Sequence, residues 1–311
     1  MTDFSHYPVM RSQCLEALSI KPEGLYVDAT LGLGGHSALI ARKLGSGRLV
    51  AIDRDETALH RAQVKLAPFM EKVTLAKGNF AELKAILSGL GIEKIDGVLF
   101  DFGVSSPQLD DPARGFSYMA DSKLDMRMDA EERLTAAEIV NSWDYEALKK
   151  IFYEYGEERY APRVANAIIN ARREGVIMTT GQLVEIIKSA MPASALREKQ
   201  HPAKRVFQAL RIAVNGELDA ISCALEQVPE LLKPGGRLCA ISFHSLEDRI
   251  VKQSIARFEK GCTCPRDLPV CVCGFKQTLR SVSRKPILPT AEEIEENPRS
   301  RSAKLRVAER V

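Results

Sequence analysis

Three glycines and one aspartate are the residues whose types and spacing first predict chemistry in this chain. Gly32, Gly34 and Gly35 separate a short apolar run from a run with helical periodicity. Glycines in such a turn let a ligand approach the backbone, because no Cβ atom stands in the way. Asp53 ends the next apolar run, about twenty residues further on, where nucleotide-binding folds place a carboxylate on ribose hydroxyls. The pattern therefore predicts a site for a ligand that contains a ribose.

The glycine spacing narrows the class of ligand. The third, packing glycine of dinucleotide-binding enzymes is missing, which favours S-adenosylmethionine over NAD. S-adenosylmethionine has a ribose and an adenine but no pyrophosphate to place at a helix N-terminus. A glycine turn without any ligand is the structural alternative, since such turns are common. An oxidoreductase that uses NAD is the weaker enzymatic alternative.

A second polar segment follows the fourth expected strand. Asp101 stands at the tip of that strand, and Ser105, Ser106, Pro107 and Gln108 come shortly after it. Moving a methyl group from a sulfonium to an exocyclic amine needs a correctly directed nitrogen lone pair rather than a strong base. Catalysis would come from positioning and from donors and acceptors fixed in advance. The segment is a candidate for this role, and a capped turn beside a strand is the structural alternative.

Alternating strands and helices are expected to hold these residues in place. Helix-type patterns separate four apolar runs in the first third of the chain, and a fifth run follows much later. Such alternation predicts an α/β fold with a Rossmann-like, doubly wound parallel sheet whose strands end at one edge. The expected strands are 26–31, 49–53, 73–76, 95–100 and 237–243.

Side chains at the ends of these strands are the candidate ligand contacts. Asp53 could accept two charge-assisted hydrogen bonds from a ribose diol, each worth about 1.5–3 kcal/mol. Phe80 follows the third expected strand and is a candidate to cover an adenine ring. An aromatic residue at that place is equally compatible with core packing.

The alternation stops between 110 and 215, where only helix-type patterns occur. We predict a helical substrate-recognition domain at 110–215. It would be inserted into a discontinuous S-adenosylmethionine-binding methyltransferase domain at 1–109 and 216–311. The stretch 262–311, rich in proline and arginine, is expected to be irregular and to wrap onto the body.

Composition argues against a membrane protein. Of the 311 residues, 45% are hydrophobic and 27% are charged, as in ordinary globular proteins. No run of about eighteen apolar residues occurs, so no membrane-spanning segment is predicted. The first residues lack a basic region followed by an apolar core, so we expect no secretory signal and a cytoplasmic location.

Basic residues are unevenly distributed. Between 159 and 211 there are ten Lys or Arg to three Asp or Glu, and between 276 and 311 there are nine to five. Such an excess predicts contact with nucleic-acid phosphates, although surface lysines and arginines are common. Candidates to stack on a splayed base are Phe116, Tyr153, Tyr155 and Tyr160.

Four of the seven cysteines form a C-x-C…C-x-C cluster, made of Cys262, Cys264, Cys271 and Cys273. Four thiolates on two short arms can surround one zinc ion tetrahedrally, although C-x-C is tighter than the usual C-x-x-C spacing. One hypothesis is a structural zinc ion that holds this stretch together. The alternatives are thiols without metal, or a disulfide. The other three are expected to be buried thiols: Cys14, Cys223 and Cys239.

Several long motifs are spread along the chain. They include Leu31-Gly-Leu-Gly-Gly-His36, Leu124-Asp-Met-Arg-Met-Asp129 and a long stretch at 241–252. Further segments of this kind lie at 51–54, 101–111, 114–117, 155–159, 201–203 and 207–211. Together these motifs resemble the RsmH family, formerly called MraW, over nearly the whole chain. The members of that family are bacterial methyltransferases that modify N4 of a cytosine in small-subunit ribosomal RNA, near the decoding site.

The resemblance implies the same reaction in this protein, with S-adenosylmethionine as cofactor. It also implies that the substrate is small-subunit ribosomal RNA, which we expect to be presented as an assembled or partly assembled subunit. The cofactor site that it implies is made by Gly34, Gly35, His36, Asp53, Phe80, Asp101 and Gln108.

Two alternatives and one assignment stay open at this point. A DNA amino-methyltransferase and a non-catalytic ribosome-assembly factor that kept the fold are the rival functions. The family's amine-orienting motif differs from the Pro-Pro-aromatic motif of DNA amino-methyltransferases, so Ser105, Ser106 and Pro107 are candidates from position alone. A homodimer is a further hypothesis.

Overall fold

The chain divides into two compact units. The computed structural model describes residues 7–260, 262, 264–265, 268–270 and 272–311. The first unit comprises Met1–Gly103 and Leu218–Val311, and the second comprises Val104–Glu217. The predicted insertion, 110–215, lies within the second unit. Each unit has its own hydrophobic core, described in turn below.

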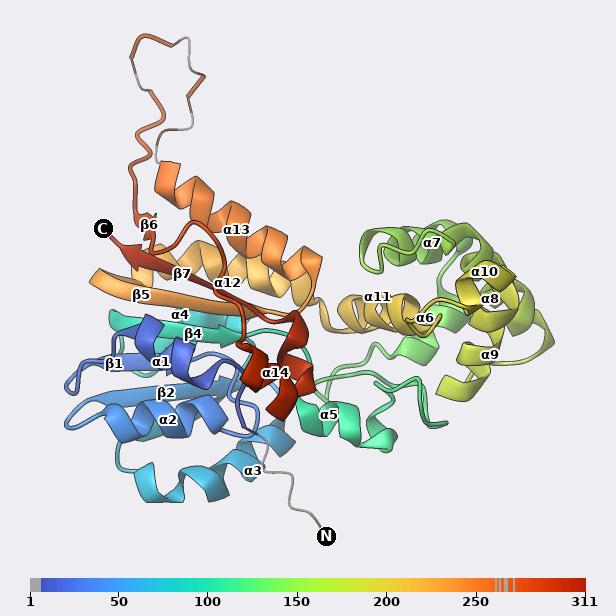
Figure 1. Ribbon diagram of the computed structural model, residues 1–311, viewed down its shortest axis with the longest axis horizontal. Coiled ribbons are helices and arrows are strands. Elements are labelled where there is room, and N and C mark those ends of the chain that lie inside the picture. The colour runs from blue at the N-terminus through green and yellow to red at the C-terminus, as the bar shows by residue number, and fades with distance from the viewer. Residues whose placement is uncertain (1–6, 261, 263, 266–267, 271) are drawn as a thin grey trace. The chain divides into compact units, whose positions relative to one another are not determined.

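A seven-stranded sheet forms the centre of the first unit, with the strand order β3-β2-β1-β4-β5-β7-β6 (Figure 1). Neighbouring strands from β3 to β5 are parallel, which confirms the predicted doubly wound sheet. β7 runs antiparallel to both β5 and β6, so the expectation of an irregular tail was wrong. The strands are β1 (Leu25–Asp28), β2 (Arg48–Asp53), β3 (Val73–Lys77), β4 (Ile95–Asp101), β5 (Leu232–Ser242), β6 (Leu279–Ser281) and β7 (Lys304–Arg310).

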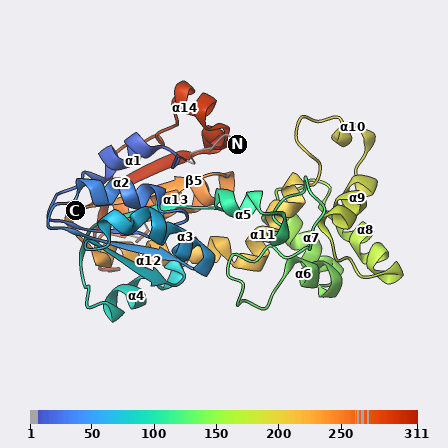
Figure 2. The same ribbon diagram turned by 90° about the horizontal axis from the view of Figure 1, so that it is seen from below.

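Helices cover both faces of this sheet, as Figure 1 and Figure 2 show. One face packs against α1 (Arg11–Leu18), α2 (Gly35–Lys43) and α3 (Glu56–Leu66). The other packs against α4 (Leu83–Gly89), α12 (Glu217–Leu231) and α13 (Ser245–Lys260). Burial on both faces explains why the centre of β4, from Gly97 to Phe100, is apolar throughout instead of alternating with polar residues. None of the helices that the structure describes has the length and apolar composition to cross a bilayer.

The register of the parallel strands brings their carboxyl ends to one edge of the sheet. Asp28 at the end of β1 is level with Leu99 of β4, and Asp101 at the end of β4 is level with Ile241 of β5. Asp53 at the end of β2 is level with Lys77 of β3. Ligands of doubly wound sheets bind beyond this edge. The sheet thus presents the polar residues predicted from the sequence on one side.

The N-terminal helix is held by the C-terminal part of the chain. In α14 (Ala291–Glu296), the Glu293 carboxylate accepts hydrogen bonds from the backbone N–H of Met10 and from the Gln13 amide, the latter at 3.3 Å. Arg11 lies 3.7 Å from the Glu296 carboxylate. These contacts fix the segment that begins at Tyr7, which packs against the loop after β1.

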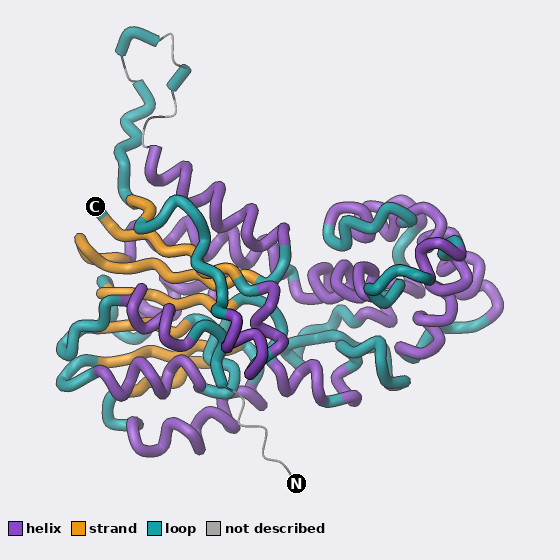
Figure 3. The backbone as a smooth tube through the Cα atoms, in the orientation of Figure 1, coloured by secondary structure: helices purple, strands orange, loops and turns teal. Residues whose placement is uncertain are grey.

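Helices make up the regular structure of the second unit, as predicted, and Figure 3 shows it without strands. Amphipathic faces of its longer helices meet in a core that includes Phe152, Ile168, Ile187 and Leu210. Its helices are α5 (Ser106–Asp110), α6 (Ala136–Ser142), α7 (Tyr145–Glu154), α8 (Ala161–Glu174), α9 (Thr180–Ala190), α10 (Ala193–Leu196) and α11 (Lys204–Asn215).

The segment 124–129 is fixed inside the second unit by hydrogen bonds. Arg127 binds both carboxylate oxygens of Asp125, at 2.7 and 2.8 Å. The buried Asn215 amide accepts from the Met128 N–H at 2.8 Å and donates to the Met126 carbonyl at 2.8 Å. Met126 has a left-handed backbone (φ 64°), which a non-glycine residue keeps only when its surroundings enforce it. The motif therefore serves the packing of this unit.

We expect Asn215→Ala to lower the stability of the second unit by about 2 kcal/mol or more, because it leaves buried backbone groups of the 124–129 segment without partners. Hydrogen exchange of the α11 amides, followed by mass spectrometry, measures this. Asn170→Ala, an exposed asparagine of α8, is the matched control. Equal protection in the two variants would contradict the assignment.

Candidate active site

The glycine loop after β1 is shaped by the protein's own packing. Gly34 has φ 73° and caps the start of α2, and a Cβ atom on it would lie 3.2 Å from Ala62 of α3. A Cβ atom on Gly35 would lie 3.1 Å from Pro8. These glycines therefore let α3 and the N-terminal segment pack closely against the loop. Their role in admitting a ligand stays a prediction.

Asp53 is oriented by backbone donors on both of its oxygen atoms. Its Oδ2 accepts from the Gly32 N–H at 2.8 Å, and its Oδ1 accepts from the Asp55 N–H at 2.9 Å. Each carboxylate oxygen has a second lone pair, so the group can still accept hydrogen bonds from a diol. Burial raises the pKa of Asp53 to about 6, which leaves it mostly ionised at neutral pH.

The buried His36 and the partly buried Asp101 lie close together at the edge of the sheet. Burial is the main cause that raises the pKa of Asp101 to about 8, and the charges of Asp28 and Glu247 add to it. Burial also lowers the pKa of His36 to about 4. Both groups are therefore mostly neutral at pH 7, so the 3.7 Å between His36 Nε2 and Asp101 Oδ2 is not an ion pair. His36 Nε2 and Asp101 Oδ1 have no hydrogen-bond partner among the described residues.

Asp28 has a structural role at the same edge. It is fully buried, and its carboxylate accepts from the Ser37 hydroxyl at 2.6 Å and from the Thr30 N–H at 3.2 Å. Both partners belong to the loop and the helix that follow β1. Asp28 therefore holds the glycine loop against the strand.

Glu247 is a buried acid of this edge that the sequence patterns did not single out. Its Oε2 accepts from the backbone N–H groups of Phe243 at 2.7 Å and His244 at 3.2 Å. His244 Nε2 lies 3.1 Å from Glu247 Oε1. A glutamate three residues into a helix that reaches back to the cap backbone is one half of a capping box, and this spacing was the available signal. Glu247 fixes the turn between β5 and α13.

Phe80 belongs to an aromatic cluster. Its ring centroid lies 5.8 Å from that of Phe100 in an edge-on arrangement and 5.7 Å from that of Phe102. The side chain is only partly buried. Core packing is therefore one role of Phe80, and cover for an adenine ring stays a prediction.

Ser105, Ser106, Pro107 and Gln108 begin the second unit and form the first turn of α5. Ser105 and Gln108 make a reciprocal capping box, in which Gln108 Oε1 accepts from the Ser105 N–H at 3.0 Å. The capped turn foreseen as the structural alternative is thus present. A role for these residues toward cofactor or amine stays a prediction.

Three of the four clustered cysteines lie together in the first unit. The Sγ atoms of Cys262, Cys264 and Cys273 are all within 4.8 Å of one another. Cys271 lies outside the described residues. Of the remaining cysteines, Cys14 and Cys239 are buried as expected, whereas Cys223 is exposed on α12, so its predicted burial was wrong.

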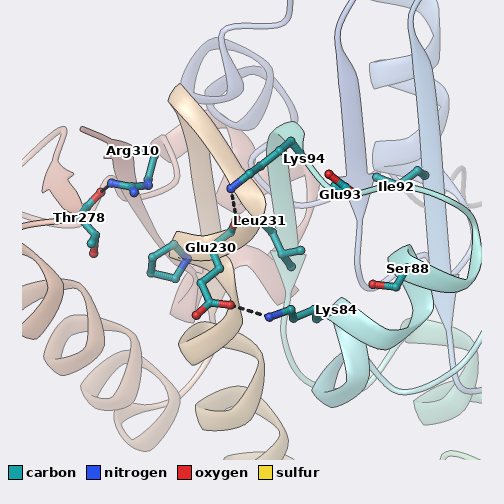
Figure 4. Close-up of a pocket in the computed structure, with 10 residues that line it drawn as sticks. Lys84, Ser88, Ile92, Glu93, Lys94, Glu230, Leu231, Thr278 and Arg310 are labelled. Atoms are coloured by element: carbon teal, nitrogen blue, oxygen red, sulfur yellow. Dashed lines mark hydrogen bonds and ion pairs between the residues drawn. The ribbon is translucent and has the colours of Figure 1, made fainter.

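A cavity of about 480 Å³ lies elsewhere in the first unit, and Figure 4 shows its lining. Lys84 and Lys94 line it. Lys84 donates a hydrogen bond to the Glu230 carboxylate at 2.6 Å, and Lys94 donates one to the Glu230 backbone carbonyl, also at 2.6 Å. None of the candidate cofactor or amine-positioning residues lines it. The cavity is therefore not the predicted cofactor site.

The pKa of Asp101 predicts how stability depends on pH. In the unfolded chain its carboxyl ionises near pH 3.8, whereas in the fold its pKa is about 8. Between these values the folded protein keeps a proton that the unfolded chain has lost, so stability falls as pH rises. We expect Asp101→Asn to lack this contribution. Urea unfolding of the ligand-free protein between about pH 5 and 8 measures the slope, and an unchanged slope would refute the burial of an acid here.

Comparison with known proteins shows the family. The model of the MraW methylase family matches residues 3–311. The ribosomal RNA small subunit methyltransferase H of Brevibacillus brevis is 54% identical over 309 residues, which cover 99% of this chain and 98% of the relative. A protein of the same name from a Paenibacillus species is 53% identical, over 99% of this chain and 100% of the relative. Another, from Symbiobacterium thermophilum, is 54% identical, over 97% of this chain and 96% of the relative. The predicted resemblance is confirmed, and the chain belongs to the MraW methylase family.

Proposed function

We propose that this protein transfers a methyl group from S-adenosylmethionine to N4 of one cytosine in small-subunit ribosomal RNA, near the decoding site. The names of its relatives support methylation of small-subunit ribosomal RNA. The choice of cytosine N4 rests on the likeness of the long motifs to the family. The one structural observation that carries the cofactor assignment is the partly buried Asp101 carboxyl group at the end of β4, whose Oδ1 has no hydrogen-bond partner in the part of the chain that the structure describes.

The first unit offers groups that fit this cofactor. S-adenosylmethionine supplies an electrophilic methyl group on a sulfonium and carries a second positive charge on its ammonium. Asp101 would accept from the cationic part of the ligand, since a neighbouring positive charge favours the ionised carboxyl. Asp53, already fixed by two backbone donors, would accept from the ribose hydroxyls. The remaining proposed contacts in this unit are Gly34, Gly35, His36 and Phe80. Gln108, which belongs to the second unit, is the last proposed contact.

Positioning is the proposed source of catalysis. Ser105, Ser106 and Pro107 would hold the amine so that its lone pair points at the methyl group, and the capping box between Ser105 and Gln108 supports the turn that they form. The nitrogen–carbon bond forms as the carbon–sulfur bond breaks, which leaves S-adenosylhomocysteine, and the methylated amine then loses one proton to water. Such a transfer requires neither a strong base nor a covalent intermediate on the protein.

Basic and aromatic side chains of the second unit are the proposed contacts with RNA. Tyr153 is 68% exposed on α7, so it is available to stack on a base. Phe116 is buried in the core of this unit, so the expectation that it stacks on a base was wrong. Arg159 lies over the Tyr160 ring and pairs with Glu198. Each arginine or lysine that neutralises a phosphate would steepen the salt dependence of binding.

Three further parts of the proposal concern partners and bound groups. We propose that the substrate is the assembled or partly assembled small subunit. We also propose that the enzyme is a homodimer. We also propose zinc as a second bound group, held by the cysteine cluster. The methyl transfer does not depend on it.

The reaction is tested by incubating the protein with labelled S-adenosylmethionine and small subunits that lack the modification. We expect label on one nucleoside, identified by mass as N4-methylated cytidine. Subunits that already carry the modification are the control and should accept little label. Label on another nucleoside would refute the N4 assignment, and label on DNA but not on subunits would refute the ribosomal substrate.

Asp53→Ala should weaken S-adenosylmethionine binding by about 2 kcal/mol or more, because the variant removes a charged acceptor of the ribose diol. Asp53→Asn, which keeps one acceptor for the backbone donors, separates a binding effect from a folding effect. Isothermal titration calorimetry measures both. Asp219→Ala, at an exposed position of α12, is the control. Unchanged affinity in both Asp53 variants would refute the ribose assignment.

A further inference from the structure

The loop between α13 and β6 buries no apolar side chain among its described residues from 262 to 273. Figure 3 shows the described residues between α13 and β6 as loop. Leu268, Val270 and Val272 are 42%, 69% and 79% exposed, whereas Phe275, nearer to β6, stacks on Phe258. A stretch without buried apolar side chains needs another source of stability, and small protein modules commonly use a metal or a disulfide.

Three thiols in this loop have the spacing of metal ligands. The Cys262 and Cys273 Sγ atoms lie 3.8 Å apart. With zinc–sulfur bonds of about 2.3 Å, two corners of a tetrahedron lie about 3.8 Å apart. Sulfur atoms joined in a disulfide lie about 2.0 Å apart, so these two are not bonded to each other. Cys264 completes the group within 4.8 Å.

A backbone donor stabilises one of these sulfur atoms. The Val272 N–H donates to Cys264 Sγ at 3.4 Å. Hydrogen bonds to the ligands from outside the metal's own shell are the usual support of a metal site. This bond joins the Cys262–Cys264 half of the loop to the residue that precedes Cys273.

We propose that Cys262, Cys264 and Cys273 bind a structural Zn²⁺ ion. Thiolate ligands select zinc, copper(I) or iron–sulfur clusters over hard cations, and zinc alone among these is redox-inert and prefers isolated tetrahedral sites. The sequence repeats the C-x-C spacing and so offers Cys271 as a further thiol, outside the described residues. The ion would tie the end of α13 to the strand that follows. No part of this site depends on the proposed methyl transfer.

Metal analysis of the full chain tests the proposal. The protein is produced in zinc-supplemented medium, purified with a reductant and without a chelator, and analysed by inductively coupled plasma mass spectrometry. We expect about one zinc per chain. A thiol-modifying reagent should release the zinc, which a chromogenic zinc indicator detects. Protein without zinc, an iron–sulfur cluster in its place, or an intact mass that shows a disulfide among these cysteines would each overturn the proposal.

Substitutions then locate the ion. Cys264→Ser and Cys273→Ser should each lose most of the zinc, whereas Cys223→Ser, at the exposed cysteine of α12, should retain it. Circular dichroism checks that each variant folds. Cobalt(II) replaces zinc in tetrahedral thiolate sites, so the wild-type protein loaded with cobalt should show intense ligand-field absorption bands, and the two cluster variants should not. Full zinc in both cluster variants would place the metal elsewhere and refute the site.

Discussion

The structure of the first unit depends on keeping carboxyl groups buried where parallel strands end. Asp28, Asp101 and Glu247 all lie at this edge; Asp28 and Glu247 are fully buried, and Asp101 is partly buried. Asp28 accepts hydrogen bonds from the loop and the helix that follow β1, and Glu247 accepts them from the turn after β5. Asp101 Oδ1 has no such partner among the described residues, and burial is the main cause that raises the pKa of Asp101 to about 8. A cationic ligand would stabilise the ionised carboxylate of Asp101. The burial that raises the pKa of this group therefore also favours the binding of such a ligand.

Both ends of the chain support this edge from outside the strands. Pro8 lies against the glycine loop, and α14 holds the N-terminal helix through Glu293. The loop is therefore fixed from two directions, by α3 through Gly34 and by the N-terminal segment through Gly35. A loop restrained in this way loses little freedom when a ligand binds, which favours affinity.

Periodicity in the sequence was enough to predict the parallel sheet and the helical insertion, because buried strands and amphipathic helices differ in period. Gly32 and Asp53 also come together as predicted, since both follow adjacent strands. β6 and β7 were missed because their stretch is rich in arginine, and pairing with β5 outweighs that composition. Glu247 was missed because burial of an acid depends on tertiary packing. Phe116 was misjudged for the same reason, since its exposure is set by partners distant in sequence.

The antiparallel strand β7 affects how the protein is made. β5 pairs with β4 on one side and with β7 on the other, and α13, the cysteine loop, β6 and α14 are all synthesised between β5 and β7. During synthesis β5 is therefore the open edge of the sheet until its last partner arrives. An unpaired apolar edge is a template for association with other chains. The nascent protein should consequently be most prone to aggregation late in translation, and a chain truncated before β7 should require chaperones to stay dispersed.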